Sequence, residues 1–125
     1  MQARAMVSRK LRSARLLRVV FVLLLAAIIY LSIAPGEATP ISGLFWDKAQ
    51  HALAYAVLGL VGLAAFGGRW PVLVALFAVS GGLEIAQALM PYGRQGDLLD
   101  MVANGTGLVL ALLAWRFGVR LRSAR

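Results

Sequence analysis

Apolar residues along the chain gather into four long runs, separated by short polar, glycine-containing or proline-containing segments. Each run is close to the roughly 20 residues that an α-helix needs to cross the hydrocarbon core of a bilayer. The pattern therefore predicts an all-α protein, an integral membrane bundle of four transmembrane helices. The predicted helices span residues 16–34, about 46–66, 70–90 and about 97–115, and the segments that end them begin at Pro35, Gly67, Pro91 and Arg116.

The composition indicates that lipid is the solvent. Apolar residues make up 61% of the 125 residues and charged residues only 14%, whereas ordinary soluble domains carry roughly 25% charged residues. A chain of this length forms one compact unit, and so small a unit could not bury that much apolar surface in water. The sequence has no cysteine, which excludes disulfide bonds, thiolate metal sites and cysteine nucleophiles.

Positive charge is concentrated at the two ends of the chain, and the formal net charge is +8. Basic clusters beside apolar runs are typical of cytoplasmic segments and bind anionic lipid headgroups, whereas a nucleic-acid domain carries its charge across a folded polar surface. We therefore expect residues 1–15 and 116–125 to be basic cytoplasmic segments that contact membrane lipids, and we expect no nucleic-acid partner. The basic residues concerned are Arg4, Arg9, Lys10, Arg12, Arg15 and Arg18 at the first run, and Arg116, Arg120, Arg122 and Arg125 after the last.

An even number of crossings places both termini on one side of the membrane, here the cytoplasmic side. The turn at residues 67–69 is then cytoplasmic too, and the two other connections face outward, with all acidic residues except Glu84 in or beside them. The alternative, that residues 16–34 belong to a cleaved signal peptide, is disfavoured because the basic leader is long and no small-x-small cleavage site follows Ala34. Aromatic residues fall at the predicted helix ends, as an aromatic belt would place them: Trp46, Trp70, Tyr92 and Trp115.

Polar residues recur at helical spacing in three of the four predicted helices. Residues three or four positions apart lie on the same face of a helix, so each set forms a stripe. With the orientation above, all three stripes lie in the outward half of the membrane, and Arg94 lies in the connection above them. This convergence predicts a shared polar site. The stripes are Asp47, His51 and Tyr55 in the second helix, Ser80, Glu84 and Gln87 in the third, and Asp97, Asp100 and Asn104 in the fourth.

Several of these residues also have a structural interpretation. Asp97, with Asp100 three positions later, fits the N-cap of the fourth helix, and Asp47 could cap the second. Structural roles are also open for Lys48 (pairing with Asp47), Tyr55 (packing) and Asn104 (hydrogen bonding between helices). Small residues permit close helix packing, which we predict for Gly59, Gly62, Gly81, Gly82, Gly105 and Gly107.

Glu84 and His51 have the strongest chemical interpretation. An ionisable carboxyl within a membrane span costs roughly 2.5–3.5 kcal/mol, so Glu84 needs a partner; His51, Arg94 and Gln87 are candidates. His51 is the sole histidine and, beside Asp47, could act as a general base or proton carrier. We therefore predict His51, Glu84 and Asp47 as catalytic residues. The predicted binding residues are Arg94, Gln87, Asp100, Asn104, Tyr55 and Lys48.

The sequence gives no reason to expect a metal ion or a cofactor. It contains neither a phosphate-binding glycine loop followed by lysine nor a paired-histidine zinc motif. With one histidine and no cysteine, a metal site would depend on carboxylates. Asp47, His51, Glu84 and Asp100 could build such a site, but their spacing does not require one.

Together, three polar segments resemble the VanZ-like family of membrane proteins, and the resemblance covers about residues 16–115. It implies a four-helix VanZ-like membrane domain over those residues, in a bacterial multi-pass protein of the cytoplasmic (inner) membrane with a cell-envelope role on its outer side. The chain departs from the family at Gly96, where such proteins often carry a bulkier residue. The segments are Asp47-Lys48-x-x-His51-x-x-x-Tyr55-x-x-x-Gly59, Glu84-x-x-Gln87, and Arg94-x-x-Asp97-x-x-Asp100-x-x-x-Asn104-x-x-Gly107.

Function stays open between hypotheses of different kinds. The namesake of the family is associated with low-level teicoplanin resistance, but a shared fold does not carry an activity with it. In the first hypothesis the outward site binds an amphiphilic envelope molecule, with or without a chemical reaction on it. In the second the protein is a non-enzymatic assembly partner whose polar cluster specifies helix packing. Ion or proton translocation is less favoured, because four short spans make a poor stand-alone transporter.

Overall fold

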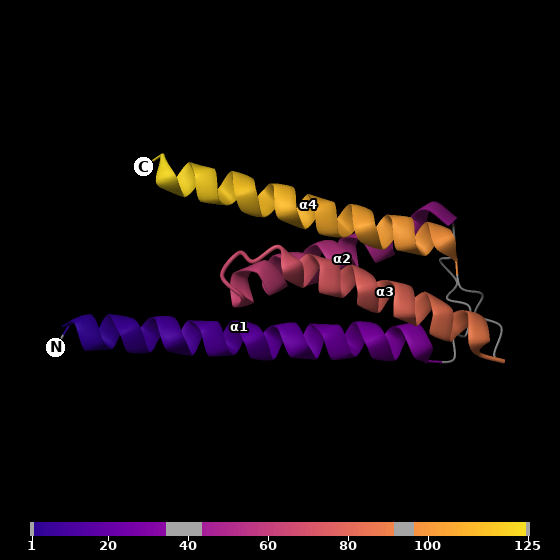
Figure 1. Cartoon of the computed structure of the whole chain (residues 1–125), viewed down its shortest axis with the longest axis horizontal. Helices are drawn as coiled ribbons and strands as arrows, with labels where there is room; N and C mark the ends of the chain where they lie inside the picture. The colour runs from indigo at the N-terminus through magenta and orange to yellow at the C-terminus, as the bar shows by residue number, and fades with distance from the viewer. Residues whose placement is uncertain (1, 35–43, 92–96, 125) are drawn as a thin grey trace.

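In a computed structural model of the protein, residues 2–34, 44–91 and 97–124 are described. They form four α-helices, and each helix is long and apolar enough to cross a membrane. This confirms the predicted all-helical chain with four apolar helices. The helices are α1 (Gln2–Ile33), α2 (Leu44–Ala65), α3 (Pro71–Leu89) and α4 (Leu98–Ser123) (Figure 1).

Two of the helices are longer than the apolar runs predicted. α1 begins at Gln2 rather than near residue 16, and α4 continues to Ser123 rather than ending near residue 115. The added segments contain no proline and are rich in arginine, which favours helix. Hydrophobicity marks only the part of a helix suited to lipid, so the basic flanks turn out to be helical continuations.

α2 ends close to the predicted position because two consecutive glycines follow it. Gly67 and Gly68 have φ angles of 69° and 77°, a left-handed conformation that costs glycine little. The Gly68 N–H donates to the Leu63 carbonyl at 2.7 Å and closes the helix end. Pro71 then begins α3, where its fixed φ and missing N–H suit the first helical position.

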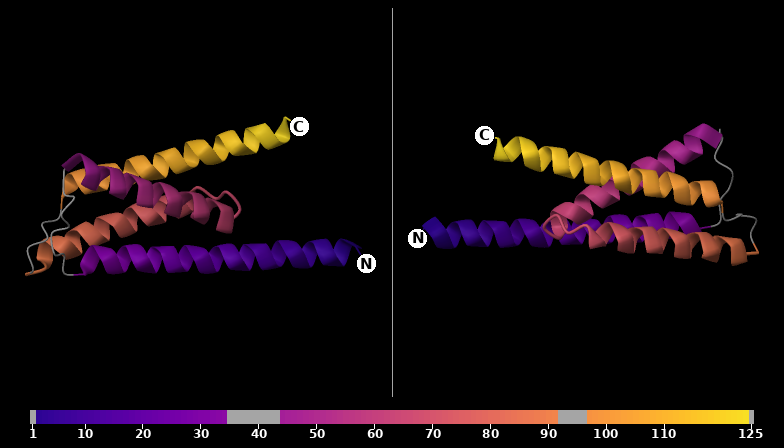
Figure 2. Two further views of the ribbon diagram at one scale, coloured as in Figure 1. Left: turned by 180° about the vertical axis from the view of Figure 1, so that it is seen from behind. Right: turned by 45° about the horizontal axis from the view of Figure 1, so that its top comes forward.

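The two ends of the bundle are made from different parts of the chain (Figure 1). The start of α1 and the end of α4 lie at the same end of the bundle, which we call the terminal end. The last turns of α1 and α3 and the first turns of α2 and α4 lie at the opposite end, which we call the polar end. α2 is inclined to the other helices: it lies against α1 near the α2–α3 turn and diverges from α1 toward the polar end (Figure 2).

α2 and α4 pack most closely, and glycines make this possible. A Cβ atom added to Gly107 would lie 2.1 Å from the backbone oxygen of Ala52, and one added to Gly59 would lie 2.9 Å from the Cβ atom of Ala111. The predicted close packing is therefore confirmed at these two positions. It is wrong for Gly82, where an added Cβ atom would meet nothing within 4 Å, because that face of α3 is turned away from its neighbours.

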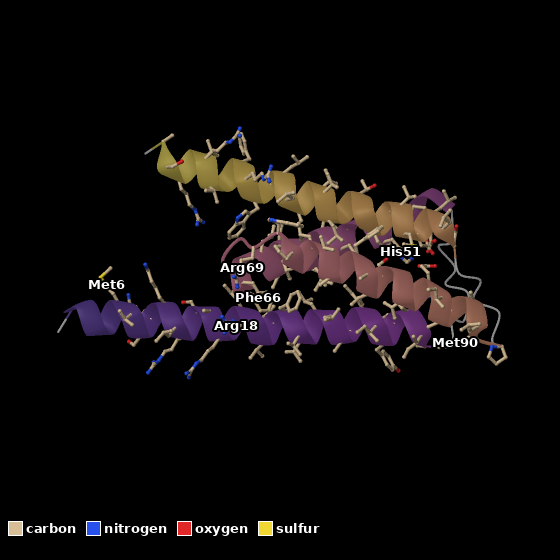
Figure 3. The ribbon with its side chains drawn as sticks, viewed as in Figure 1. Met6, Arg18, His51, Phe66, Arg69 and Met90 are labelled. Atoms are coloured by element: carbon tan, nitrogen blue, oxygen red, sulfur yellow. The ribbon has the colours of Figure 1, made fainter. Side chains whose placement is uncertain are left out.

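α1 is attached to α2 near the middle of its own length. The Phe21 ring would lie 3.0 Å from a Cβ atom on Gly62, and it meets the Phe66 ring edge-on with centroids 5.4 Å apart. Arg18 donates from Nε to the Ala65 carbonyl at 3.4 Å, and its guanidinium lies 5.8 Å from the centroid of the Phe66 ring (Figure 3). This contact fixes α1 to the end of α2.

Candidate functional site

The three predicted polar stripes converge at the polar end around a partly open cavity of about 450 Å³. His51 lies among the helices there, at the same end as Met90 and far from Met6 (Figure 3). α2, α3 and α4 supply the charged and polar wall, and α1 supplies a mostly apolar one. The cavity is lined by Asp47, Lys48, Gln50, His51, Ala54 and Tyr55 of α2, Ser80, Leu83, Glu84 and Gln87 of α3, Asp97, Asp100 and Asn104 at the start of α4, and Ile28, Leu31 and Ser32 of α1.

Lys48 is the centre of a cluster of ion pairs. Its Nζ donates to Asp97 Oδ2 at 2.6 Å, to Asp47 Oδ2 at 3.3 Å, and to Asp100 Oδ1. The side chains of Lys48 and Asp100 are only 19% and 13% exposed, so solvent screens this pair less than a surface pair. The predicted pairing of Lys48 with Asp47 is confirmed. Because two further carboxylates come from the start of α4, one ammonium group ties α2 to α4.

His51 faces two residues of α4. Its Nδ1 lies 3.1 Å from Asn104 Oδ1, and its Nε2 lies 3.7 Å from Asp100 Oδ2. Since Asn104 donates from Nδ2 to Ser80 Oγ at 2.7 Å, its Oδ1 is the acceptor that remains for His51, and Nδ1 carries the hydrogen. In that tautomer Nε2 carries the lone pair through which a histidine acts as a base, and Asp100 lies beside it.

Asn104 connects three helices from a buried position. Its side chain reaches His51 on α2 and Ser80 on α3, and the residue is only 2% exposed. Ser80 is fully buried, and Tyr55, 3% exposed, lines the same cavity. A polar chain therefore runs from His51 through Asn104 to Ser80. It confirms the predicted interhelical hydrogen bonding of Asn104.

Glu84 is buried, with 8% of its surface exposed, and its partner is a backbone group. Its Oε2 accepts a hydrogen bond from the Asp97 N–H at 2.8 Å, immediately before α4. The N-terminal end of a helix carries partial positive charge, which suits a carboxylate. Of the partners that the sequence suggested, His51 faces α4 and Gln87 bonds to α1 instead, and Arg94 lies outside the described residues.

Gln87 ties α3 to α1. It donates from Nε2 to the backbone oxygen of Ser32 at 2.8 Å, and both residues line the cavity. The sequence could not predict this bond, because a backbone carbonyl near the end of a helix carries no side-chain signal. Gln87 therefore holds the α1 wall of the cavity in place.

Asp97 caps α4, as predicted. Its Oδ1 accepts from the Leu99 N–H at 2.8 Å, which satisfies one of the unpaired N–H groups at the helix start. The hydrogen bond from the Lys48 ammonium, and after it the Leu99 N–H, hold the pKa of Asp97 below its ordinary value. The carboxylate is therefore charged throughout the neutral pH range.

All the predicted site residues that the structure describes line one cavity, and Arg94 lies outside the described residues. The sequence analysis did not predict that α1 forms one wall of the cavity. Of the three α1 residues in that wall, only Ser32 is polar. The sequence analysis also missed the residues between the stripes. The lining residues not predicted are Ile28, Leu31, Ser32, Gln50, Ala54 and Leu83.

Three of the described residues could hold a cation together. Asp47, His51 and Asp100 each offer one acceptor or ligand atom, and these atoms lie within 4.8 Å of one another. Two carboxylates and an imidazole can bind a metal ion or an organic ammonium group. The expectation that no metal binds stays a prediction.

The geometry described above can bind charge and move protons at one end of an otherwise apolar bundle. A histidine lone pair faces a carboxylate, an ammonium neutralises part of the acidic cluster, and a cavity adjoins both. Comparisons of the chain with protein-family models, with curated proteins and with solved structures find no match.

Proposed function

We propose that the chain is a VanZ-like protein of the bacterial cytoplasmic membrane whose polar end opens on the outer face and binds the polar headgroup of an amphiphilic envelope molecule. The single observation that carries this proposal is the cavity of about 450 Å³, lined by charged residues of α2, α3 and α4 and by apolar residues of α1. Ligand pockets in proteins span roughly 300–1,000 Å³ and combine apolar walls with a few polar groups.

The charge distribution supports the orientation in this proposal. The terminal end carries the basic clusters of residues 1–15 and 116–125, and basic segments favour the cytoplasmic side, where they contact anionic lipid headgroups. With both termini in the cytoplasm, the polar end faces outward. A cavity there is placed to receive molecules of the cell envelope.

An amphiphile fits the two kinds of wall. Its headgroup would meet Lys48, His51 and the acidic residues, and its chain would lie against Ile28 and Leu31 of α1. His51 supplies the group for proton transfer to or from the bound headgroup, with Asp100 held 3.7 Å from its Nε2. Glu84 and Asp47 adjoin this pair as acidic groups.

In this proposal Arg94 contacts an anionic part of the ligand, since a guanidinium binds phosphate well. The bound molecule is chemically changed if His51 transfers a proton during a reaction, and it is only bound if His51 serves as a hydrogen-bonding group. A role in glycopeptide resistance rests on the family resemblance alone.

The test compares His51→Ala and Glu84→Gln with Thr106→Ala, a control on α4 whose hydroxyl bonds only to its own helix at Val102. Sensitivity of the producing cells to envelope-directed antibiotics, teicoplanin among them, is measured at matched protein levels. We expect the two site variants to lose the wild-type phenotype and the control to keep it. Wild-type behaviour of both site variants would contradict the proposal.

One observation favours the rival hypothesis of a structural network. Among the described residues, no buried side-chain nitrogen or oxygen lacks a hydrogen-bond partner, as expected of a cluster that specifies helix packing. In that case His51→Ala and Glu84→Gln should lower accumulation and thermal stability in proportion to any loss of phenotype. A variant that is as stable as wild type yet inactive distinguishes the two.

A further inference from the structure

We infer that the cavity selects an amphiphile whose headgroup carries a protonated primary amine, and that this molecule reaches the cavity sideways, between the polar-end halves of α1 and α2. This inference rests on the proposed function and names its ligand class and route. It is carried by the charge of the cavity, the spacing of its acceptors and the divergence of two helices.

The cavity is acidic although the chain is basic. Its lining holds four carboxylates, Asp47, Glu84, Asp97 and Asp100, against one lysine, Lys48, so with all of them ionised four negative charges face one positive charge. The whole chain, by contrast, carries a net charge of +8. Because like charges repel most strongly where water is scarce, a cationic headgroup relieves this repulsion and an anionic one adds to it.

Lys48 shows how an ammonium group is bound here. Its Nζ contacts one oxygen of each of three carboxylates: Oδ1 of Asp100, Oδ2 of Asp97 and Oδ2 of Asp47. Asp100 Oδ2 faces His51 Nε2 across 3.7 Å instead, a distance too long for a direct hydrogen bond. The cluster therefore keeps acceptor capacity beyond what Lys48 takes up.

The remaining acceptors match a second ammonium group. One atom each from Asp47, His51 and Asp100 lie within 4.8 Å of one another, and a primary ammonium has three N–H donors to give. Acceptors that each lie about 2.9 Å from a tetrahedral ammonium nitrogen are about 4.7 Å apart, so atoms within 4.8 Å of one another are close enough to share one ammonium group. The three atoms can accept N–H groups of one headgroup, which a quaternary ammonium cannot supply.

The cavity reaches toward the side of the bundle where α1 and α2 part. These helices touch near the α2–α3 turn, where Phe21 packs on Gly62 and Arg18 reaches Ala65, and they diverge toward the polar end (Figure 2). Ile28 and Leu31 of α1 line the cavity opposite α2.

The α1 wall is fixed on its other side. Gln87 donates to the Ser32 backbone oxygen and holds α1 against α3, so within residues 2–34, 44–91 and 97–124 the α1–α2 side is the one that we assign to passage. An apolar chain lying in the bilayer can follow this side while its headgroup enters the acidic cavity.

Three amphiphiles with the same twelve-carbon chain test the ligand class. Purified full-length protein in phosphatidylcholine nanodiscs is titrated with dodecylamine, dodecyltrimethylammonium or dodecyl phosphate, and binding is measured by calorimetry against empty nanodiscs. We expect dodecylamine to bind at least about tenfold more tightly than the other two, a difference of about 1.4 kcal/mol. Equal binding of the trimethylammonium compound, or tighter binding of the phosphate, would overturn the inference.

Two variants distinguish binding by the three acceptor atoms of Asp47, His51 and Asp100 from binding by the overall negative charge of the cavity. Asp47→Asn and Asp97→Asn each remove one carboxylate that contacts Lys48, but only Asp47 belongs to the three acceptors. We expect Asp47→Asn to weaken dodecylamine binding about tenfold and Asp97→Asn to weaken it much less. Equal effects, or displacement of dodecylamine by micromolar Mn²⁺, would point to unspecific acidity or to a metal site and would overturn the inference.

The route is tested in the same cysteine-free chain. Ile28→Cys and Ala54→Cys are combined, and the isolated protein is joined across α1 and α2 with a bismaleimide, with the unlinked double variant as control. If the two cysteines are cross-linked before dodecylamine is added, the protein should no longer bind dodecylamine. If they are cross-linked after dodecylamine has bound, the ligand should stay trapped. Binding of the linked protein at the unlinked rate would exclude the lateral route. Loss of phenotype in His51→Ala together with no preference for dodecylamine would leave the proposed function standing and remove this inference.

Discussion

The terminal half and the polar end of the bundle are held together by different forces. In the terminal half, α1 and α2 meet through Phe21, Gly62 and Phe66, and the Trp115 ring of α4 would lie 2.8 Å from a Cβ atom on Gly68. At the polar end Lys48 joins α2 to α4, and Asn104 joins α4 to α3. One half is packed through aromatic rings on glycine, and the other is connected through hydrogen bonds and ion pairs around a cavity.

This difference indicates where function lies. Aromatic packing stabilises a bundle, whereas ionisable groups buried within membrane spans are costly and mark functional sites. The α1 residues that line the cavity, Ile28, Leu31 and Ser32, also lie at the polar end. Predictions that change one region and leave the other intact test this division.

The largest effect on stability is expected at the packing interface between α2 and α4, which extends through both regions. Gly107→Ala places a Cβ atom 2.1 Å from the Ala52 backbone oxygen, and a backbone cannot move aside as a flexible side chain can. We expect a loss of about 3 kcal/mol or more in the free energy of unfolding, measured by denaturant titration in mixed micelles.

Gly82→Ala is the matched control, because an added Cβ atom there meets nothing within 4 Å. Replacing a helical glycine by alanine in open space should leave stability unchanged or raise it by up to about 1 kcal/mol. Wild-type stability of Gly107→Ala would show that the two helices are not packed as described.

A smaller effect is expected from the ion-pair cluster at the polar end. Asp100→Asn removes the most buried carboxylate bound to Lys48. We expect the free energy of unfolding to fall by about 2 kcal/mol. This is less than the 3–5 kcal/mol of a fully buried pair, because Asp47 and Asp97 stay in contact with the ammonium.

The double variant Lys48→Met/Asp100→Asn shows whether the two residues act together. If they are coupled, its unfolding free energy falls by less than the sum of the two single losses, which is the result we expect. Additive losses would contradict the described pairing and would weaken the contrast between the two ends.

The smallest effect is a pH dependence that belongs to the polar end. Because Lys48 and the Leu99 N–H lower the pKa of Asp97, its stabilising contribution is complete above its unfolded pKa of about 4 and is lost as the pH falls through the folded pKa. Asparagine keeps the N-cap but not the charge. The difference in unfolding free energy between wild type and Asp97→Asn should therefore shrink from about pH 7 to about pH 3, and a constant difference would argue against the pairing with Lys48.

Much of this division could be predicted from residue spacing. The i, i+4 stripes on three helices placed Asp47, His51, Glu84 and Asp100 at one end, because a regular helix fixes which residues share a face. Gly67 likewise marked the α2–α3 turn, since glycine adopts backbone conformations that end a helix.

The pairing between helices could not be predicted in the same way. Glu84 binds the Asp97 N–H and Gln87 binds the Ser32 carbonyl, and both partners are backbone groups that every sequence position offers. That Lys48 contacts Asp97 and Asp100 as well as Asp47 depends on the rotation and inclination of α2 against α4, which a hydrophobic pattern does not contain. The extension of α1 to Gln2 was missed because charge conceals a helix from a search for apolar runs.

The most direct test of an accessible cavity at an outward polar end is thiol labelling in intact cells. Ala54→Cys puts one thiol in the cavity of a chain that has no other cysteine, and Gly118→Cys puts one near the terminal end, where nothing crowds it. A membrane-impermeant thiol reagent should modify Ala54→Cys from outside and Gly118→Cys only after the cells are opened. Labelling of Gly118→Cys in intact cells, or an Ala54→Cys thiol that reacts only after the cells are opened, would contradict an outward-facing site.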